Sequence, residues 1–192
     1  MKSVLVSEKP IMCEKIAKGK KTIIIKKKAP KEVPFKGFIY CTQSKSDIAL
    51  LMSNDEDKKF IFADYRNAYN CDVNGKVDWD MCDGKVIGEF VCNEVEELHE
   101  WELSPQGRFA DFERERLAEF LTASCLSELE VVKYRENLPY YKPLYGWHIS
   151  DLKIYDKSRE LGEFGKFGFG HEVPLERPCA PWCYVEDLGE IK

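Results

Sequence analysis

The stretch Lys9–Lys26, KPIMCEKIAKGKKTIIIK, decides the fold. Pro10 favours the start of a helix, because the first helical position needs no backbone N–H. Apolar residues at helical spacing follow it, and Gly19 is a candidate C-cap. The run Lys21–Lys26 is rich in β-branched residues and predicts a strand. The stretch is therefore predicted to form a helix, a glycine turn and a strand.

Further short strands are predicted on both sides of this element, from alternating or β-branched segments. They are Ser3–Val6, Phe35–Thr42, Phe60–Ala63, Lys85–Cys92, Trp147–Tyr155 and Trp182–Glu186. Gly88 interrupts the strongest of them and marks a bulge or a close approach of backbones. Asn74-Gly75 is typical of a hairpin turn.

Helices are expected mainly in the second half of the chain. Ser104-Pro105 predicts a helix that continues to about residue 122, and Ser127–Glu130 fits a capping box for a helix ending near Glu136. Asp156–Phe164 is interpreted as a short helix, and the glycine-rich stretch 162–170 as a loop. Strands and helices do not alternate as in βαβ folds, so the fold class is α+β with a mixed or barrel-like sheet.

The length of 192 residues indicates a single domain over 1–192. Residues at about 43–80 are interpreted as an insertion or extra hairpin, and those at about 104–137 as a helical insertion. With 44% hydrophobic and 33% charged residues, the composition excludes global disorder. No apolar run approaches the roughly 18 residues of a membrane span. The stretch MKSVLVSEKP does not resemble a signal peptide, so the predicted location is cytoplasmic, with no membrane partner.

Charge is divided unequally along the chain. Residues 1–45 contain twelve lysines and three glutamates, a net +9, so the remainder carries −14 of the total −5. Seven lysines fall between 18 and 31. Such a cluster indicates either a polyanion contact on one face or simply a solvated lysine face. The acidic remainder argues against coating long duplex DNA.

The eight cysteines contain no CxxC pair, and we expect reduced, partly buried thiols. They lie at positions 13, 41, 71, 82, 92, 125, 179 and 183. The alternative is zinc held by Cys179, Cys183 and His171. Structural zinc sites usually take four ligands in tight pairs, and this sequence has a single CxxxC. No metal and no cofactor are therefore predicted.

Three stretches in order carry a family resemblance. They are Lys9-Pro10 followed by Gly19–Lys26, then Gly84–Cys92, then Leu144–Tyr155. Together they resemble the ASCH domain family, a branch of the PUA-like β-barrels, and in particular its small bacterial and phage members. The ending RPCAPWCYVE also resembles the RPPQSWCYVE ending usual in that family.

The resemblance implies a PUA-like mixed β-barrel with flanking helices and a cleft beside the helix–GK–strand element. It implies RNA or nucleotide binding. A few members are similar to amidohydrolases that remove an acyl group from the exocyclic nitrogen of modified cytidine, using a lysine and a threonine of this stretch. Gly19, Lys21 and Thr22 match the pattern, but Ile24 stands at the catalytic threonine and Lys26 at the arginine.

Isoleucine neither donates a proton nor attacks a carbonyl, and lysine lacks the planar fork of arginine. The resemblance therefore favours a binding domain over an enzyme. The predicted nucleic-acid or nucleotide-binding residues are Lys9, Gly19, Lys20, Lys21, Thr22, Lys26, Trp147 and His148.

Lys21 has two possible roles. If it faces the barrel mouth, burial lowers its pKa and makes it a candidate base or nucleophile. If it faces water, it contacts phosphate, and the neighbouring Lys18 and Lys20 favour this second role. Strand alternation places Lys21 and Lys26 on opposite faces. Trp147 is expected in the core, with the adjacent His148 pointing the other way.

The predicted ligand is RNA or a modified nucleotide. The first alternative is an amidohydrolase acting on N-acylated cytidine-type nucleosides, with Lys21 beside Glu89. The second is an adaptor whose acidic portion, 46–192, meets a basic protein partner that the sequence does not identify. Four tyrosines would supply base-stacking surfaces or else lie at the core edge, namely Tyr40, Tyr140, Tyr141 and Tyr145.

Overall fold

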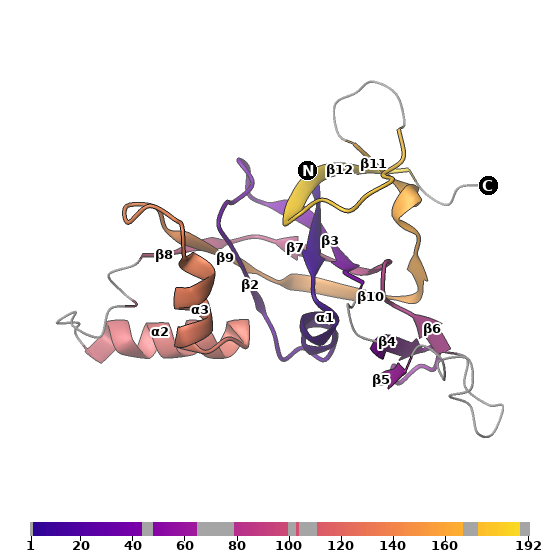
Figure 1. Ribbon diagram of the computed structural model, residues 1–192, viewed down its shortest axis with the longest axis horizontal. Coiled ribbons are helices and arrows are strands. Elements are labelled where there is room, and N and C mark those ends of the chain that lie inside the picture. Colours follow the sequence, from indigo (N-terminus) through magenta and orange to yellow (C-terminus); the bar gives the residue numbers. More distant parts are fainter. Residues whose placement is uncertain are drawn as a thin grey trace.

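The computed structural model describes residues 2–43, 48–64, 79–99, 103, 111–166 and 173–188. Within them lie three α-helices and twelve strands arranged in three sheets (Figure 1). The helices are α1 Pro10–Ala17, α2 Asp111–Ser124 and α3 Glu128–Arg135. The predicted α+β class is confirmed. No helix in these ranges is long and apolar enough to cross a membrane.

The largest sheet has six strands in the order β10-β7-β3-β1-β12-β11. Only the β1–β3 pairing is parallel, and the other pairings are antiparallel. The strands are β1 Ser3–Glu8, β3 Phe35–Cys41, β7 Val86–Cys92, β10 Ser150–Arg159, β11 Phe164–Lys166 and β12 Trp182–Asp187. The predicted strands at 3–6, 35–42, 85–92 and 182–186 are confirmed.

Strand β3 is buried on both faces, because it lies inside the six-stranded sheet. Phe35 and Ile39 pack into one apolar cluster, and Phe38 and Tyr40 into another. Because successive side chains of a strand point to opposite faces, β3 contributes apolar side chains to a core on each side of the sheet. Neither face of this strand is turned to solvent. The sheet separates these cores, and β1 beside it is likewise buried.

A second sheet, in the order β2-β9-β8, is antiparallel throughout. Its strands are β2 Ile23–Lys26, β9 Leu144–His148 and β8 Val95–Leu98. Trp147 of β9 is fully buried and makes edge-on ring contacts with Phe35 at 5.1 Å and Trp182 at 5.4 Å. These contacts join the second sheet to the first, as expected of a core tryptophan.

Helices α2 and α3 pack against the other side of the second sheet. Ile23 and Ile25 share a buried cluster there with Phe120 of α2 and Val131 of α3. A third sheet, in the order β5-β4-β6, comprises β4 Ile48–Ser53, β5 Phe60–Asp64 and β6 Trp79–Met81. In Figure 1 the α2–α3 pair and this small sheet lie at opposite ends of the molecule.

The start of the chain follows its local signals. Helix α1 has Pro10 at its first position, and Gly19 just beyond its end has φ of 67°, a left-handed conformation that glycine adopts without strain. Ser127 and Glu130 form the predicted capping box of α3. These predictions hold because each depends only on residues a few positions apart.

Two predicted elements are wrong. Trp147–Tyr155 is two strands of different sheets, broken at Ile149, whose N–H donates to Thr22 O. Asp156–Phe164 is not a helix: β10 continues to Arg159, and a single 3₁₀ turn, η3 Leu161–Glu163, follows. The Ser158 N–H donates to Asp80 Oδ2 at 2.6 Å, which holds this segment extended against β6.

Three predicted features fall outside the described residues. They are the hairpin at Asn74-Gly75, the helix start at Ser104-Pro105 and residues 167–170 of the glycine-rich stretch. The described part of that stretch, 162–166, is the end of η3 and the strand β11 Phe164–Lys166, so the predicted loop is wrong there. The third sheet lies mostly within 43–80, and α2 and α3 lie within 104–137. Treating these two ranges as insertions in one domain stays a prediction.

Gly88 provides a test of the packing between β7 and its neighbours. A Cβ at this position would lie 2.5 Å from Lys153 O, a backbone atom that cannot move without distorting β10. We predict that Gly88→Ala lowers the free energy of unfolding by about 3 kcal/mol, measured by urea denaturation. The matched control is Gly165→Ala, where the nearest atom is the Leu188 side chain at 3.1 Å. An equal loss in both variants would contradict the close approach.

Candidate functional site

A cavity of about 480 Å³ opens where the end of β1 meets α1, β2, α3 and the turn before β12. Its lining combines charged and apolar side chains from segments far apart in the sequence. The lining residues are Ser7, Glu8, Lys9, Met12, Lys21, Ile25, Lys26, Leu126, Glu130, Lys133, Tyr134 and Pro181. No single stretch of the chain forms this site.

An ion pair between Glu8 and Lys26 lies in one wall. Each residue is the last of its strand, Glu8 of β1 and Lys26 of β2. The Lys26 Nζ lies 2.7 Å from Glu8 Oε1 and also donates to Ser7 O at 3.0 Å. The two side chains are only 6% and 10% exposed, so solvent screens the pair weakly. The pair joins the first sheet to the second at the cavity.

Lys21 is 3% exposed, and its Nζ donates to Ser124 O at 2.7 Å. Burial lowers the pKa of Lys21, and the positive charges of Lys26 and Lys15 act in the same direction. The carboxylate of Glu8 opposes this shift. The interpretation of Lys21 as a water-facing lysine is therefore wrong, because the end of α2 covers it.

Strand alternation does not apply to Lys21, because β2 begins only at Ile23. The Lys21 N–H donates back to Lys15 O, and the Thr22 N–H donates to Ala123 O. This irregular backbone brings Lys21 and Lys26 to the same cavity. The predicted separation of the two lysines on opposite faces is thus wrong.

Lys9 and Lys133 form part of the lining and are exposed to solvent. Among the ion pairs of the described residues, none includes either side chain. The lining as a whole contains four lysines and two glutamates. With Glu8 already paired to Lys26, positive charge prevails in a concave, partly apolar space, which favours an anion.

The apolar part of the lining is formed by Met12, Ile25, Leu126 and the half-buried Tyr134. Burial raises the pKa of Tyr134, so its hydroxyl remains protonated at neutral pH. The Lys27 Nζ lies 5.2 Å from the centre of the Tyr134 ring. A ligand with an anionic group and a flat or apolar part matches this arrangement.

Lys9, Lys21 and Lys26 are the predicted site residues that line the cavity. Lys20 and Thr22 lie elsewhere, in an open depression of about 540 Å³ beside α2. Gly19 forms the turn after α1. The lysine cluster at 18–31 is therefore divided between two surfaces of the protein.

The other predicted residues lie away from the cavity. Trp147 is in the core, and the His148 Nε2 is 3.4 Å from Glu96 Oε2. Glu89, the carboxylate expected beside Lys21, instead binds Lys36 at 2.8 Å and accepts the Tyr155 hydroxyl at 2.7 Å. The carboxylates that line the cavity are Glu8 and Glu130.

Sequence reasoning missed Glu8 and the contribution of α3. The signal for Glu8 is its position directly before Lys9-Pro10, where a strand end meets a helix start. For Glu130, Lys133 and Tyr134 no local signal exists, because only the packing of α3 against β2 brings them to the cavity.

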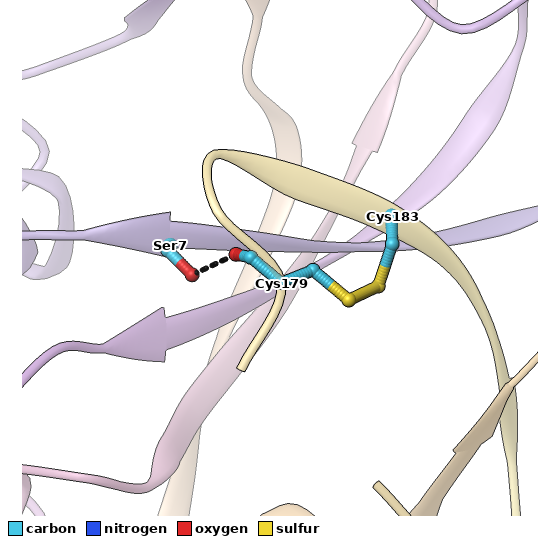
Figure 2. The surroundings of a disulfide bond; sticks show 3 residues. All are labelled: Ser7, Cys179 and Cys183. Carbon is cyan, nitrogen blue, oxygen red and sulfur yellow. Dashed lines mark hydrogen bonds between the residues drawn. A yellow bond between two sulfur atoms is a disulfide. The ribbon is translucent and has the colours of Figure 1, made fainter. Parts of the chain in front are cut away.

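Cys179 and Cys183 are joined by a disulfide beside the cavity (Figure 2). Their Cα atoms are 5.6 Å apart, within the usual range for a disulfide. The expectation of reduced thiols is wrong for this pair, and the disulfide consumes the two thiolates that the zinc alternative needs. His171 lies outside the described residues.

The expectation of reduced thiols does hold for other described cysteines. Cys13, Cys41, Cys82 and Cys92 are buried and free. Burial raises the pKa of the Cys92 thiol to about 11, and it also raises the pKa values of Cys13 and Cys82. The thiols of Cys13, Cys82 and Cys92 therefore stay protonated and unreactive at neutral pH.

No protein-family model and no curated protein matches the chain. Among solved structures, the chain is similar to ASCH from Zymomonas mobilis, with 13% identity over 83% of this chain and 74% of that chain and a TM-score of 0.48.

Two structures of single-substitution mutants of the same Zymomonas mobilis protein are similar to the same degree. One has 12% identity over 84% of this chain and 77% of that chain, with a TM-score of 0.48. The other has 13% identity over 83% and 75%, also with a TM-score of 0.48. Identity this low concerns the fold alone, so the chemistry of the cavity has to come from its own side chains.

The lowered pKa of Lys21 predicts a pH dependence of stability. Below its lowered native pKa the lysine is charged in both states, and the cost of burying its ammonium is fully present. Between its lowered native pKa and the unfolded value of about 10.4, the unfolded state binds more protons, so the free energy of unfolding rises with pH.

We predict that Lys21→Met removes this rise. In urea denaturation from pH 7 to pH 11, wild type should gain stability relative to Lys21→Met as the pH increases. The other lysines contribute equally to the pH dependence of the unfolding free energy in both proteins, so the difference between the two proteins reports Lys21 alone. A difference that stays constant over this range would show that Lys21 titrates normally.

Proposed function

We propose that this protein binds RNA or a nucleotide in the cavity beside Glu8 and Lys26. The observation that carries the proposal is the gathering of four lysines from three segments around one partly apolar space. Lysine ammonium groups bind phosphate as point charges. Lys9 and Lys133 are exposed and accessible to a phosphate, whereas Lys21 and Lys26 lie deeper.

The size and lining of the cavity favour a single nucleotide unit. Its volume of about 480 Å³ is within the usual range for small-molecule sites. Tyr134, Met12 and Ile25 offer an aromatic and aliphatic surface for a base or sugar. The Glu130 carboxylate, whose Oε2 accepts from Ser127, offers its other oxygen as an acceptor for base amino groups. An unpaired base fits such a space, whereas a duplex does not enter it.

Substitution of lysines inside and outside the cavity tests this proposal. Lys9→Ala and Lys133→Ala should each weaken binding of single-stranded RNA at all sequences and reduce the slope of log affinity against log salt by about 0.7 per lost phosphate contact. Lys21→Ala should also weaken binding clearly more than Lys28→Ala. Fluorescence anisotropy at several salt concentrations measures these effects.

The matched control is Lys28→Ala, because Lys28 is exposed in the same lysine-rich segment but does not line the cavity. Circular dichroism confirms that each variant is folded. Equal losses for Lys28→Ala and the cavity variants would indicate a diffuse basic surface and contradict a specific site.

A second candidate function is hydrolysis of an N-acylated nucleoside. The observation that favours it is the lowered pKa of Lys21, which increases the fraction of neutral amine available as a base, close to the carboxylate of Glu8. Ile24, at the position of the amidohydrolases' catalytic threonine, is fully buried in the core. Any such reaction would therefore depend on Lys21 and Glu8 instead of a threonine nucleophile.

Turnover of N-acylated cytidine tests this alternative. If Lys21 is the base, Lys21→Met should reduce turnover by about 100-fold or more, while Lys28→Ala retains it. Chromatography of the released cytidine is the measurement. Activity that is equal in wild type and Lys21→Met would exclude the lysine mechanism.

A further inference from the structure

The disulfide Cys179–Cys183 closes a short loop that forms one wall of the cavity. Cys183 lies in β12, where it pairs with Leu5 of β1, while Cys179 precedes the turn. Pro181, between the two cysteines, lines the cavity. The covalent bond therefore ties the free side of this wall to the six-stranded sheet.

The loop is coupled to the ion pair through Ser7. The Ser7 hydroxyl donates to Cys179 O at 2.7 Å, as Figure 2 shows, and the Ser7 N–H donates to Pro181 O at 3.0 Å. The Ser7 carbonyl in turn accepts from Lys26 Nζ at 3.0 Å. A continuous series of hydrogen bonds thus leads from the disulfide loop to the ammonium group in the cavity.

The two ends of the loop are held differently. Trp182 pairs with Val6 and packs edge-on against Trp147 at 5.4 Å, so the β12 end stays in place without the disulfide. At the other end, Cys179 is linked to the sheet covalently by the disulfide, by its carbonyl hydrogen bond with Ser7 and by packing against the apolar cluster around Leu5. Breaking the disulfide removes the covalent link and leaves the weaker contacts to hold the Cys179 end.

We propose that Cys179 and Cys183 form a reversible redox-modification site that controls the affinity of the cavity for its ligand. The disulfide holds Pro181 and Ser7 in the arrangement that lines the cavity, and reduction loosens both. The effect on the ligand rests on the proposed nucleotide-binding function. The loosening of Ser7 does not depend on that function.

The chemistry requires a dithiol reductant as co-reactant. A thiolate of the dithiol attacks one sulfur of the pair, the Cys179–Cys183 bond breaks, and a mixed disulfide forms. The second thiol of the reductant then displaces the protein sulfur. The protein gains two electrons and two protons as two thiols, and the dithiol becomes an intramolecular disulfide. The reverse exchange restores the protein disulfide.

Accessibility favours this pair over the buried cysteines of the described residues. Cys179 and Cys183 are half-buried near the protein surface, whereas four of the free cysteines are buried. Cys125 is half-buried but free. It therefore provides the matched control, because Cys125→Ser removes a thiol of similar exposure without touching the loop.

The experiment follows two properties of the full chain before and after treatment with dithiothreitol. The first is the amide hydrogen exchange of Ser7, measured by NMR, and the second is affinity for a fluorescein-labelled single-stranded oligouridine. Reduction should speed Ser7 exchange and weaken binding about fivefold or more, the low end of coupling between linked sites. Cys179→Ser should behave as reduced wild type and ignore the dithiol, while Cys125→Ser should respond as wild type does.

The outcomes separate this inference from the proposed function. Thiol counting in denaturant must show two additional thiols after reduction, and no increase would overturn the modification site. Unchanged Ser7 exchange after confirmed reduction would overturn the coupling. Faster Ser7 exchange without RNA binding in either state would support the redox site and contradict the proposed function. Faster exchange with unchanged RNA affinity would overturn the control of the ligand.

Discussion

The ion pair between Glu8 and Lys26 is the interaction on which the site depends. It connects the last residue of β1 to the last residue of β2, and therefore one sheet to the other. Because both side chains are nearly buried, removing one partner would leave an uncompensated charge, at a cost of about 3–5 kcal/mol. The same pair fixes the wall of the cavity and influences the pKa of Lys21 from both sides, since Glu8 raises it and Lys26 lowers it.

Local signals predicted many of the elements, but not where the elements meet. Proline at the first position of α1, the Gly19 turn and the Ser127–Glu130 capping box act within a few residues, so sequence alone was sufficient. The predicted helix at Asp156–Phe164 failed for the opposite reason. Its extended form depends on the Ser158 bond to Asp80, a residue far away in the chain. A pattern of side chains does not reveal such a partner.

The candidate site likewise contains residues that the sequence predicted and residues that only the packing brings together. Lys9, Lys21 and Lys26 belong to the stretch that also carries the family resemblance, and the structure brings them to one cavity. The assumption of regular alternation nevertheless separated Lys21 from Lys26, because it extended β2 two residues too far toward the N-terminus. The lining from α3 and the wall at Pro181 could not be predicted from the sequence. Both segments lie more than 100 residues after β2 in the chain, and only the packing of the folded protein brings them to the cavity.

The net charge of +9 in residues 1–45 does not amount to a uniformly basic face. Lys2, Lys18, Lys26 and Lys36 are paired with Glu32, Glu14, Glu8 and Glu89, respectively. Lys20 lines a depression that also contains Glu115 and Glu119. Among the described residues, lysines that form no ion pair are therefore found at a few positions, among them Lys9 at the cavity. A phosphate attracted by the lysine-rich segment would meet neutralised surface elsewhere, so the concave shape of the cavity, more than the number of lysines, determines where an anion is held.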